Sequence, residues 1–235
     1  MKIINVEKKI GGFVLETGCV QIETGCIHGF IGSNGSGKTT LAKLITGILE
    51  PDRGRIDYGD LTMRDITMTS QRPYLLHDTV YENIVYPLKI RRIKPDKRAV
   101  LDMLEACGMG GKEKQSARSL SSGERQKVSM LRAMCFHPRL VIIDETLSNL
   151  DPDSVDFFEK QIRKMNQEEE NTWILISHRL SHIGKMCRRI HALDKGKIVQ
   201  SGRAEEVLFH SPVPEVQRFL KGEMLSFPGT DINER

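Results

Sequence analysis

The sequence has no apolar run long enough to cross a membrane. A helical span needs roughly 20 consecutive apolar residues, and polar or charged residues interrupt every apolar stretch of this 235-residue chain well before that length. Its first residues, MKIINVEKKI, also lack the apolar core of a secretion signal. We therefore expect a soluble protein that reaches a membrane only through a partner.

Closely spaced cysteines and a strong net charge are missing as well. The five cysteines (Cys19, Cys26, Cys107, Cys135 and Cys187) are scattered, and no two have the Cys-x-x-Cys spacing. This pattern argues against a disulfide framework or a zinc site and favours buried thiols in a reducing compartment. The formal net charge of +4 is small for this length and does not predict a dedicated nucleic-acid surface.

Short β-type runs separated by glycine turns make up the first part of the chain. They cover residues 2–6, 13–16, 20–22 and 26–31, and predict an antiparallel edge that leads into a buried strand. Continuous apolar runs at residues 140–143 and 173–176 are typical of parallel strands that are covered on both faces. The chain length suits one α/β domain, or a core domain with a smaller lobe.

Helical patterns occupy most of the remaining chain. Leu41, Leu44, Ile45 and Ile48 recur at helical spacing and predict a helix that Pro51 ends. Helical patterns dominate residues 80–135, which we expect to form a helical lobe inserted into a single domain of 235 residues. A further helix is predicted from Pro152 onward, with Asp151 as its N-cap, and residues 211–235 are expected to form a partly mobile tail.

A glycine-rich loop follows the fourth β-type run. Residues 32–39 read Gly-Ser-Asn-Gly-Ser-Gly-Lys-Thr and stand between a predicted strand and a predicted helix. Glycines let successive backbone N–H groups turn towards a phosphate, and the helix adds its positive N-terminal end. Lys38 can reach the outer phosphates, and the hydroxyl of Thr39 can bind Mg²⁺. The loop therefore predicts a nucleoside triphosphate site.

Two acids end the apolar run at residues 140–143. Asp144 and Glu145 at the end of a buried strand are costly without a cation or strong donors nearby. Asp144 is the candidate to hold Mg²⁺, and Glu145 is the candidate to orient and deprotonate an attacking water. An apolar run that ends in acids is common by itself. It indicates a metal and hydrolysis site here because the phosphate loop accompanies it.

Four further segments give the chain a resemblance to the ATP-binding-cassette (ABC) ATPases. Residues 120–126, Leu-Ser-Ser-Gly-Glu-Arg-Gln, resemble the signature of that family; Gln71 resembles its glutamine loop, residues 148–151 its aspartate loop, and His178 its switch histidine. The resemblance implies an α/β fold: a P-loop NTPase core of mainly parallel sheet flanked by helices, with an N-terminal antiparallel β lobe and an inserted helical lobe. It also implies ATP and Mg²⁺ as ligands and ATP hydrolysis as the reaction.

The resemblance assigns roles to individual residues. Glu145, His178 and Lys38 would be catalytic, and Thr39, Gln71 and Asp144 would contact the metal. Ser121, Ser122 and Gly123 would meet the γ-phosphate of ATP bound to a second subunit, and Asp151 would bridge the two subunits. The full set of expected nucleotide contacts is Gly32, Ser33, Asn34, Gly35, Ser36, Gly37, Lys38, Thr39, Thr40, Gln71, Ser121, Ser122, Gly123, Glu124, Asp144 and Asp151.

The sequence departs from the pattern of the family at several positions. Ser122 stands where the signature usually has glycine, and Glu124 where it often has glutamine. Thr146 replaces a proline that commonly follows the catalytic glutamate, and we expect a looser turn there. The aromatic residue that stacks on adenine should lie near Ile10, where the nearest aromatic is Phe13. The other histidines fit no metal spacing.

A transporter is the first functional hypothesis. The chain resembles stand-alone ATP-binding subunits of small-solute importers, of which tungstate, molybdate or phosphate types are candidates. The partners would be a second ATPase subunit, expected to be an identical copy, the membrane-spanning permease subunits and, indirectly, an extracytoplasmic solute-binding protein. The protein would be cytoplasmic and peripheral on the inner face of the cell membrane. Residues 74–81 are the expected docking segment for the permease.

Two other hypotheses remain open. A soluble ABC-type ATPase could act on nucleic acid or ribosomes, although we expect no nucleic-acid partner because the net charge is small. A nucleotide-dependent dimerisation switch without catalysis is the other, and the presence of both Lys38 and Glu145 argues against it.

Overall fold

The computed structural model describes residues 1–225, with the side chains of Asn149, Met224 and Leu225 excepted. The chain divides into two compact units. The first unit comprises Met1–Ile22, Ile27–Gly59 and Ile176–Arg235, and the second comprises Glu23–Cys26 and Asp60–Leu175. Each unit is described in turn.

The first unit is built on a mixed sheet. Its neighbouring strands are, in order, β3 (Cys19–Gln21), β1 (Lys2–Ile10), β2 (Phe13–Glu16), β10 (Lys197–Arg203), β9 (Arg189–Asp194) and β4 (Ile27–Ile31), and β5 (Arg53–Asp57) also pairs with β1. Pairing is antiparallel between β1 and each of β2, β3 and β5, and parallel between β4 and β9. All five residues of β4 are buried. This confirms the predicted antiparallel edge that leads into a buried strand.

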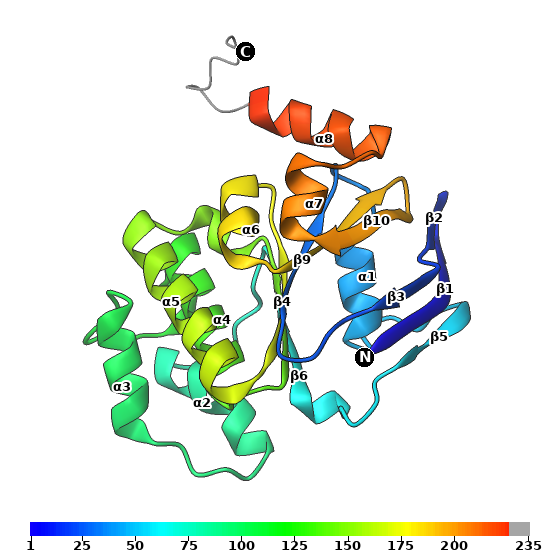
Figure 1. Cartoon of the computed structure of the whole chain (residues 1–235). Coiled ribbons are helices and arrows are strands. Elements are labelled where there is room, and N and C mark those ends of the chain that lie inside the picture. The colour runs from blue at the N-terminus through cyan, green and yellow to red at the C-terminus, as the bar shows by residue number, and fades with distance from the viewer. Residues whose placement is uncertain (226–235) are drawn as a thin grey trace. The chain divides into compact units, whose positions relative to one another are not determined.

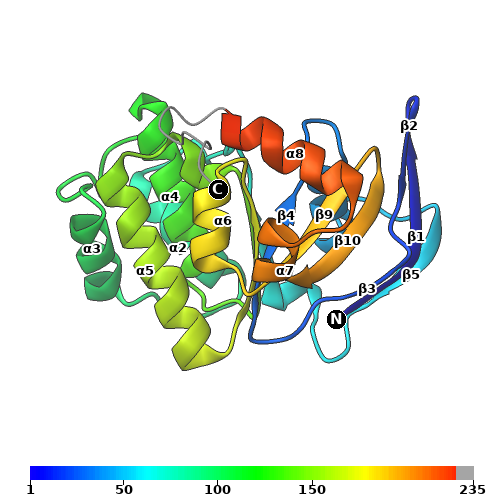
Figure 2. The same cartoon turned by 45° about the horizontal axis from the view of Figure 1, so that its top comes forward.

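Four helices belong to the described part of the first unit. They are α1 (Lys38–Ile45), α6 (Leu180–Met186), α7 (Ala204–Phe209) and α8 (Pro214–Leu225). Figure 2 shows α7 and α8 beside β9 and β10, which they contact. Helix α8 lies within the segment that was expected to be a tail, and residues 226–235 of that segment lie outside the described residues.

Helix α1 is shorter than the apolar pattern predicts. Leu41, Leu44 and Ile45 are buried, as expected, but the helix ends at Ile45 and the side chain of Ile48 is 63% exposed. Gly47 has a φ of 70°. Because glycine adopts this left-handed conformation without strain, it turns the chain out of the helix. The prediction that Ile48 belongs to the apolar face is therefore wrong.

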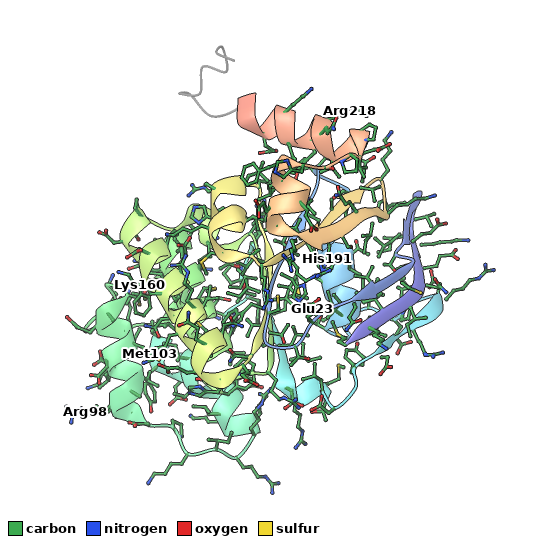
Figure 3. All side chains as sticks on the ribbon, in the orientation of Figure 1. Glu23, Arg98, Met103, Lys160, His191 and Arg218 are labelled. Carbon is green, nitrogen blue, oxygen red and sulfur yellow. The ribbon has the colours of Figure 1, made fainter. Side chains whose placement is uncertain are left out.

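Two histidines join neighbouring strands in the core of the first unit. Nδ1 of His28 on β4 lies 3.0 Å from Nε2 of His191 on β9, and Nδ1 of His191 lies 2.8 Å from the hydroxyl of Ser201. Burial, together with the charge of His28, lowers the pKa of His191 to about 3. Figure 3 labels His191, which is only 1% exposed. His191 is therefore a neutral residue of the core.

The second unit combines three adjacent strands with four helices. The strands are β8 (Thr172–Ile176), β7 (Leu140–Asp144) and β6 (Ile66–Thr69), and the last two are parallel. The helices are α2 (Val80–Ile90), α3 (Lys97–Ala106), α4 (Ser122–Met134) and α5 (Pro152–Glu169), which are labelled in Figure 1. Every residue of β7 and β8 is buried, as their continuous apolar runs predict. Strand β6 was not predicted, because it has only four residues and two apolar side chains.

Capping residues set the beginnings of these helices. The Asp151 carboxylate accepts a hydrogen bond from the backbone N–H of Ser154 at 2.9 Å, which confirms it as the N-cap of α5. Asp96 caps α3 and Thr79 caps α2 in the same way. Three helices thus fall within residues 80–135, where helical patterns dominate the sequence. None of the helices in residues 1–225 combines the length and the apolar character that a membrane span requires.

Candidate active site

The glycine-rich loop of the first unit joins β4 to α1. Gly32, Gly35 and Gly37 have φ values of 141°, 76° and 108°. A Cβ atom on Gly32 would lie 2.1 Å from the backbone oxygen of Leu193, and one on Gly37 would lie 2.7 Å from Cδ1 of Leu15. These two positions therefore admit only glycine, because both the backbone conformation and the space exclude a side chain.

Lys38 lies against the inside of this loop. Its ammonium donates hydrogen bonds to the backbone oxygens of Gly32 at 2.6 Å and Ser33 at 2.9 Å, and its side chain is buried. The loop itself is tied to the β9–β10 turn, because the N–H of Gly196 donates to the oxygen of Ser36 at 3.0 Å. Thr39 is exposed in the first turn of α1. A cation, a helix N-terminus and an exposed hydroxyl are thus gathered at one loop, which suits a phosphate chain with its metal ion.

Phe13 lies beside the loop, although it is 25 positions before Lys38 in the sequence. The turn between β1 and β2 places it opposite Ile10. A Cβ atom built on Gly37 would be 3.0 Å from Cζ of Phe13, and one on Gly196 would be 3.3 Å from Cε2. The ring is partly exposed. An aromatic face is therefore available next to the phosphate loop.

His178 follows β8 and is partly exposed. The residue before it, Ser177, uses its hydroxyl to accept a hydrogen bond from the N–H of Arg179 at 3.1 Å. This bond shapes the turn that presents the imidazole at the end of a buried strand.

Asp144 ends β7, the central strand of the second unit, and Glu145 follows it. Asp144 is 5% exposed, and Glu145 is partly exposed. Glu145 has φ and ψ of 54° and 11°, the left-handed conformation that residues other than glycine seldom adopt. Such local strain is often found where a side chain is held for function. Glu145 therefore has a backbone conformation that Asp144, the last residue of the strand, does not share.

Thr146 ties this turn to the neighbouring strand. Its hydroxyl lies 2.7 Å from that of Thr69 at the end of β6, and also donates to the backbone oxygen of Asp144 at 3.3 Å. Both threonines are almost fully buried. We expected a looser turn at Thr146 than a proline would give; the hydroxyl supplies two bonds there that a proline could not.

Gln71 follows β6 and is exposed. Its backbone oxygen accepts a hydrogen bond from Nε2 of Gln126 at 3.2 Å. Gln126 is buried on α4, the helix that begins with the signature residues. The glutamine loop and the signature helix are therefore joined by a side chain that the sequence did not single out.

The signature residues form the N-terminal turn of α4. Ser121 and Glu124 make a reciprocal capping box: the N–H of Ser121 donates to the Glu124 carboxylate at 2.8 Å, and the N–H of Glu124 donates to the Ser121 hydroxyl at 3.3 Å. Lys112 forms an ion pair with the same carboxylate. The bonds from Lys112 and Ser121 hold the pKa of Glu124 at about 2. Ser122 is exposed at the first position of the helix.

Asp151 is also engaged within the chain. Besides capping α5, its carboxylate accepts a hydrogen bond from the Ser154 hydroxyl at 2.8 Å and lies 3.0 Å from the ammonium of Lys127 on α4. The bonds from Ser154 and Lys127 hold the pKa of Asp151 well below its ordinary range. Half of the Asp151 side chain remains exposed. Two consecutive residues of α4, Gln126 and Lys127, thus contact the glutamine loop and the aspartate loop.

A profile of the ABC transporter family matches residues 16–148, more than half of the chain. The chain belongs to the ABC transporter family. One relative, the tungstate uptake system ATP-binding protein TupC of Peptoclostridium acidaminophilum, is 34% identical over 83% of this chain and 95% of its own length. The methionine import ATP-binding protein MetN 2 of Oceanobacillus iheyensis is 31% identical over 91% of this chain and 67% of its own length.

A solved structure agrees with the fold of this ABC ATPase. The dimeric cassette MJ0796, in a post-hydrolysis state bound to ADP and Pi, has a TM-score of 0.75 and 24% identity over 86% of this chain and 98% of its own. The predicted fold class, a P-loop NTPase core with an antiparallel N-terminal lobe and an inserted helical lobe, is confirmed, as is the prediction of an ATPase.

The predicted site residues of this ABC ATPase fall into two groups. The first unit holds the loop at residues 32–40 and His178, and the second unit holds Gln71, the signature residues, the two acids after β7, and Asp151. Within the second unit the contacts of α4 connect three of these segments. Gln126, Lys127, Lys112 and Thr69 were missed by sequence reasoning, because each acts through a contact between distant parts of the chain.

Proposed function

We propose that this ATPase powers the import of a small solute through membrane-spanning partner subunits. The observation that carries the proposal is the phosphate loop, with its two obligatory glycines and its internally bonded Lys38, in a chain similar over most of its length to ATP-binding proteins of uptake systems. The named relatives serve tungstate and methionine. Small solutes are therefore the proposed class.

The loop is suited to the triphosphate of ATP. Residues 32–40 offer backbone N–H groups and the N-terminal end of α1, and Lys38 neutralises the outer phosphates. Phe13, beside Gly37 and Gly196, offers its ring to the adenine. Phe13 thus becomes the proposed aromatic contact of the base.

The donors available for Mg²⁺ are oxygen atoms, which this hard cation prefers. Thr39 supplies a hydroxyl, Asp144 a carboxylate and Gln71 an amide oxygen. Magnesium in triphosphate sites keeps few protein ligands and binds substrate phosphates, so a partial protein donor set fits it. When bound, the ion would screen the phosphate charges during the reaction.

Hydrolysis is assigned to Glu145 and His178. Glu145, held in its left-handed turn, orients water and accepts its proton as the water attacks the γ-phosphorus. His178 donates a hydrogen bond to the γ-phosphate. Lys38 remains on the outer phosphates and stabilises the charge that develops as the bond to the β-phosphate breaks.

A second copy of the chain is proposed to complete each site. Ser122 and Gly123, at the exposed N-terminal turn of α4, would face the γ-phosphate of ATP on the partner, where a helix N-terminus favours an anion. Ser121 and Glu124 shape this turn through the capping box, and Asp151, half exposed, would reach the partner. The related cassette that was solved as a dimer supports this arrangement.

The permease is proposed to dock on the second unit beside the glutamine loop. A cavity of about 240 Å³ there is lined by Met68, Leu76, Tyr86 and Pro87, among others. Tyr74 is 72% exposed nearby in the sequence. Of the residues expected to line the docking segment, Leu75 and Val80 are instead buried in the core, at 8% and 0% exposed. The prediction that these two face a partner is wrong.

Substitution of Glu145 tests the catalytic assignment. Glu145→Gln should abolish phosphate release while retaining ATP, and size-exclusion chromatography with ATP should show a stable dimer. Glu168→Gln, an exposed glutamate on α5 in the same unit, is the matched control and should hydrolyse ATP normally. Normal turnover by Glu145→Gln would refute its role as the base.

Recovery of the native complex tests the transport assignment. The chain, purified from detergent-solubilised membranes, should bring with it a polytopic membrane protein, and Tyr74→Ala combined with Tyr86→Ala should lose that protein while keeping basal ATPase activity. Recovery of ribosomes or DNA in place of a membrane protein contradicts the proposal and favours a nucleic-acid function.

A further inference from the structure

The segment that ends α2 and begins α3 concentrates the positive charge of the protein. Residues 89–98 contain six basic side chains and one acid, a net charge of +5. The whole chain has a formal charge of +4, so all the other residues together carry −1. The six basic residues are Lys89, Arg91, Arg92, Lys94, Lys97 and Arg98.

Two of these six have a role in the fold. Lys89 forms an ion pair with Glu82, which lies two turns earlier on α2. Arg91 donates to the backbone oxygens of Pro87 at 3.2 Å and Arg64 at 2.6 Å, and its guanidinium lies 3.8 Å from the ring centre of Phe136. Both also stand at the C-terminal end of α2, where the helix dipole favours positive charge.

The other four have no such role. Arg92, Lys94, Lys97 and Arg98 are exposed, and no side-chain hydrogen bond or ion pair links them to the residues that the structure describes. Lys97 and Arg98 even occupy the first turn of α3, which contains no acid and where the dipole disfavours positive charge. Figure 3 shows Arg98 projecting outward from α3. Folding alone does not account for these four charges.

Exposed isoleucines accompany the charges. Ile90 and Ile93 are 60% and 47% exposed. One turn before Ile90 on the same face of α2 lies Tyr86, which is 43% exposed and lines the groove proposed for the permease. The exposed apolar face of α2 therefore continues from that groove to the basic segment.

We propose that residues 89–98 bind the anionic lipid headgroups of the membrane beside the permease. The proposal rests on the proposed function, which brings the chain to a membrane. Arg92, Lys94, Lys97 and Arg98 pair with lipid phosphates, and Ile90 and Ile93 enter the headgroup boundary. Basic side chains mixed with exposed apolar ones are typical of such surfaces.

The nature of the charge separates lipid from the other candidate partners. Cytoplasmic loops of membrane proteins are themselves rich in lysine and arginine, so the permease would repel this segment. Nucleic acid would attract the charges, but phosphate binding makes no use of two exposed isoleucines. An anionic bilayer matches both features.

Vesicle co-sedimentation of the purified full chain tests the proposal. The chain should bind vesicles of phosphatidylcholine containing about one third phosphatidylglycerol, should not bind pure phosphatidylcholine, and should be released by high salt. A variant with Arg92→Gln, Lys94→Gln, Lys97→Gln and Arg98→Gln should bind up to about 600-fold more weakly, because each of the four basic residues near an anionic surface contributes roughly fivefold. Basal ATPase activity should be unchanged.

A matched variant controls for net charge. The changes Lys2→Gln, Arg55→Gln, Arg218→Gln and Lys221→Gln remove the same charge from exposed side chains elsewhere, and vesicle binding should be retained. Equal weakening by the two variants overturns the proposal, because the effect would then come from net charge.

Three further results bear on the partner. Tighter binding of duplex DNA, lost in the variant of residues 92–98, overturns the proposal in favour of nucleic acid. If the variant of residues 92–98 loses the membrane protein from the purified complex but binds vesicles as the wild type does, the proposal is overturned in favour of a protein contact. A membrane protein that co-purifies with a chain unable to bind anionic vesicles refutes the lipid contact alone and leaves the proposed function standing.

Discussion

The bond between Thr69 and Thr146 allows a sharp test of how the catalytic turn is held. The two hydroxyls lie 2.7 Å apart, and their residues are 1% and 0% exposed. Thr146→Val keeps the shape of the side chain but leaves the hydroxyl of Thr69 buried without this partner. An unsatisfied buried hydroxyl costs about 1–3 kcal/mol of unfolding free energy, whereas removal of both partners is nearly neutral. Thr146→Val should therefore destabilise the protein more than the double change. Thr69→Val should cost less, because the Thr146 hydroxyl keeps its bond to the backbone oxygen of Asp144.

Urea unfolding measures the three variants. A loss of about 2 kcal/mol, with a denaturant dependence of about 2 kcal/mol per molar urea, lowers the unfolding midpoint by about 1 M. Trp173 is the only tryptophan of the chain, is fully buried in β8 of the same unit, and donates to Asn171 at 3.3 Å. Its fluorescence reports unfolding close to the substituted bond.

The double variant decides the outcome. Thr69→Val with Thr146→Val should recover most of the lost stability, and Thr67→Val, a partly exposed threonine on the same strand, should change stability by less than about 0.5 kcal/mol. Losses that simply add in the double variant would show that the two hydroxyls are not coupled. ATPase activity should fall in the single variants, because the bonded turn positions Glu145.

Two more predictions concern the signature turn and the adenine. Glu124→Gln should lower the stability most above pH 5 and progressively less as the pH falls. The Glu124 carboxylate has a pKa of about 2 in the folded protein against an ordinary 4.5, so its contribution to stability is present above the ordinary pKa and is lost as the carboxylate becomes protonated. Urea midpoints from pH 7 to pH 3 measure this, and a difference between variant and wild type that stays constant with pH contradicts it. Phe13→Ala should weaken ATP binding by about fivefold or more while leaving binding of inorganic tripolyphosphate unchanged, and Phe13→Tyr should bind ATP as the wild type does. Calorimetric titration measures both affinities. Equal ATP affinity of Phe13→Ala and the wild type would remove Phe13 from the site.

Sequence reasoning succeeded wherever structure depends on neighbouring residues. Alternating and continuous apolar runs predicted β1, β2, β4, β7 and β8, and the capping pattern at Asp151 predicted the start of α5. It failed at α1, where a glycine in the left-handed conformation ends the helix before Ile48. It also missed β6, because a strand of four residues with only two apolar side chains gives too short a pattern.

The sequence by itself determined which residues carry the chemistry. The order of the phosphate loop, Gln71, the signature, Asp144 with Glu145, and His178 identified an ABC ATPase, because each segment is local and its residue types are tied to the phosphates and metal ion they bind.

Only the tertiary structure decided how those residues are held. It joined Thr69 to Thr146 across 77 positions and Gln71 to Gln126 across 55, and it paired Glu124 with Lys112 and Asp151 with Lys127. It also left the side chains of Arg92, Lys94, Lys97 and Arg98 exposed and without ion pairs among the described residues. Spacing in the sequence cannot reveal these features, because hydrogen bonds and exposure depend on which distant side chains meet when the chain folds.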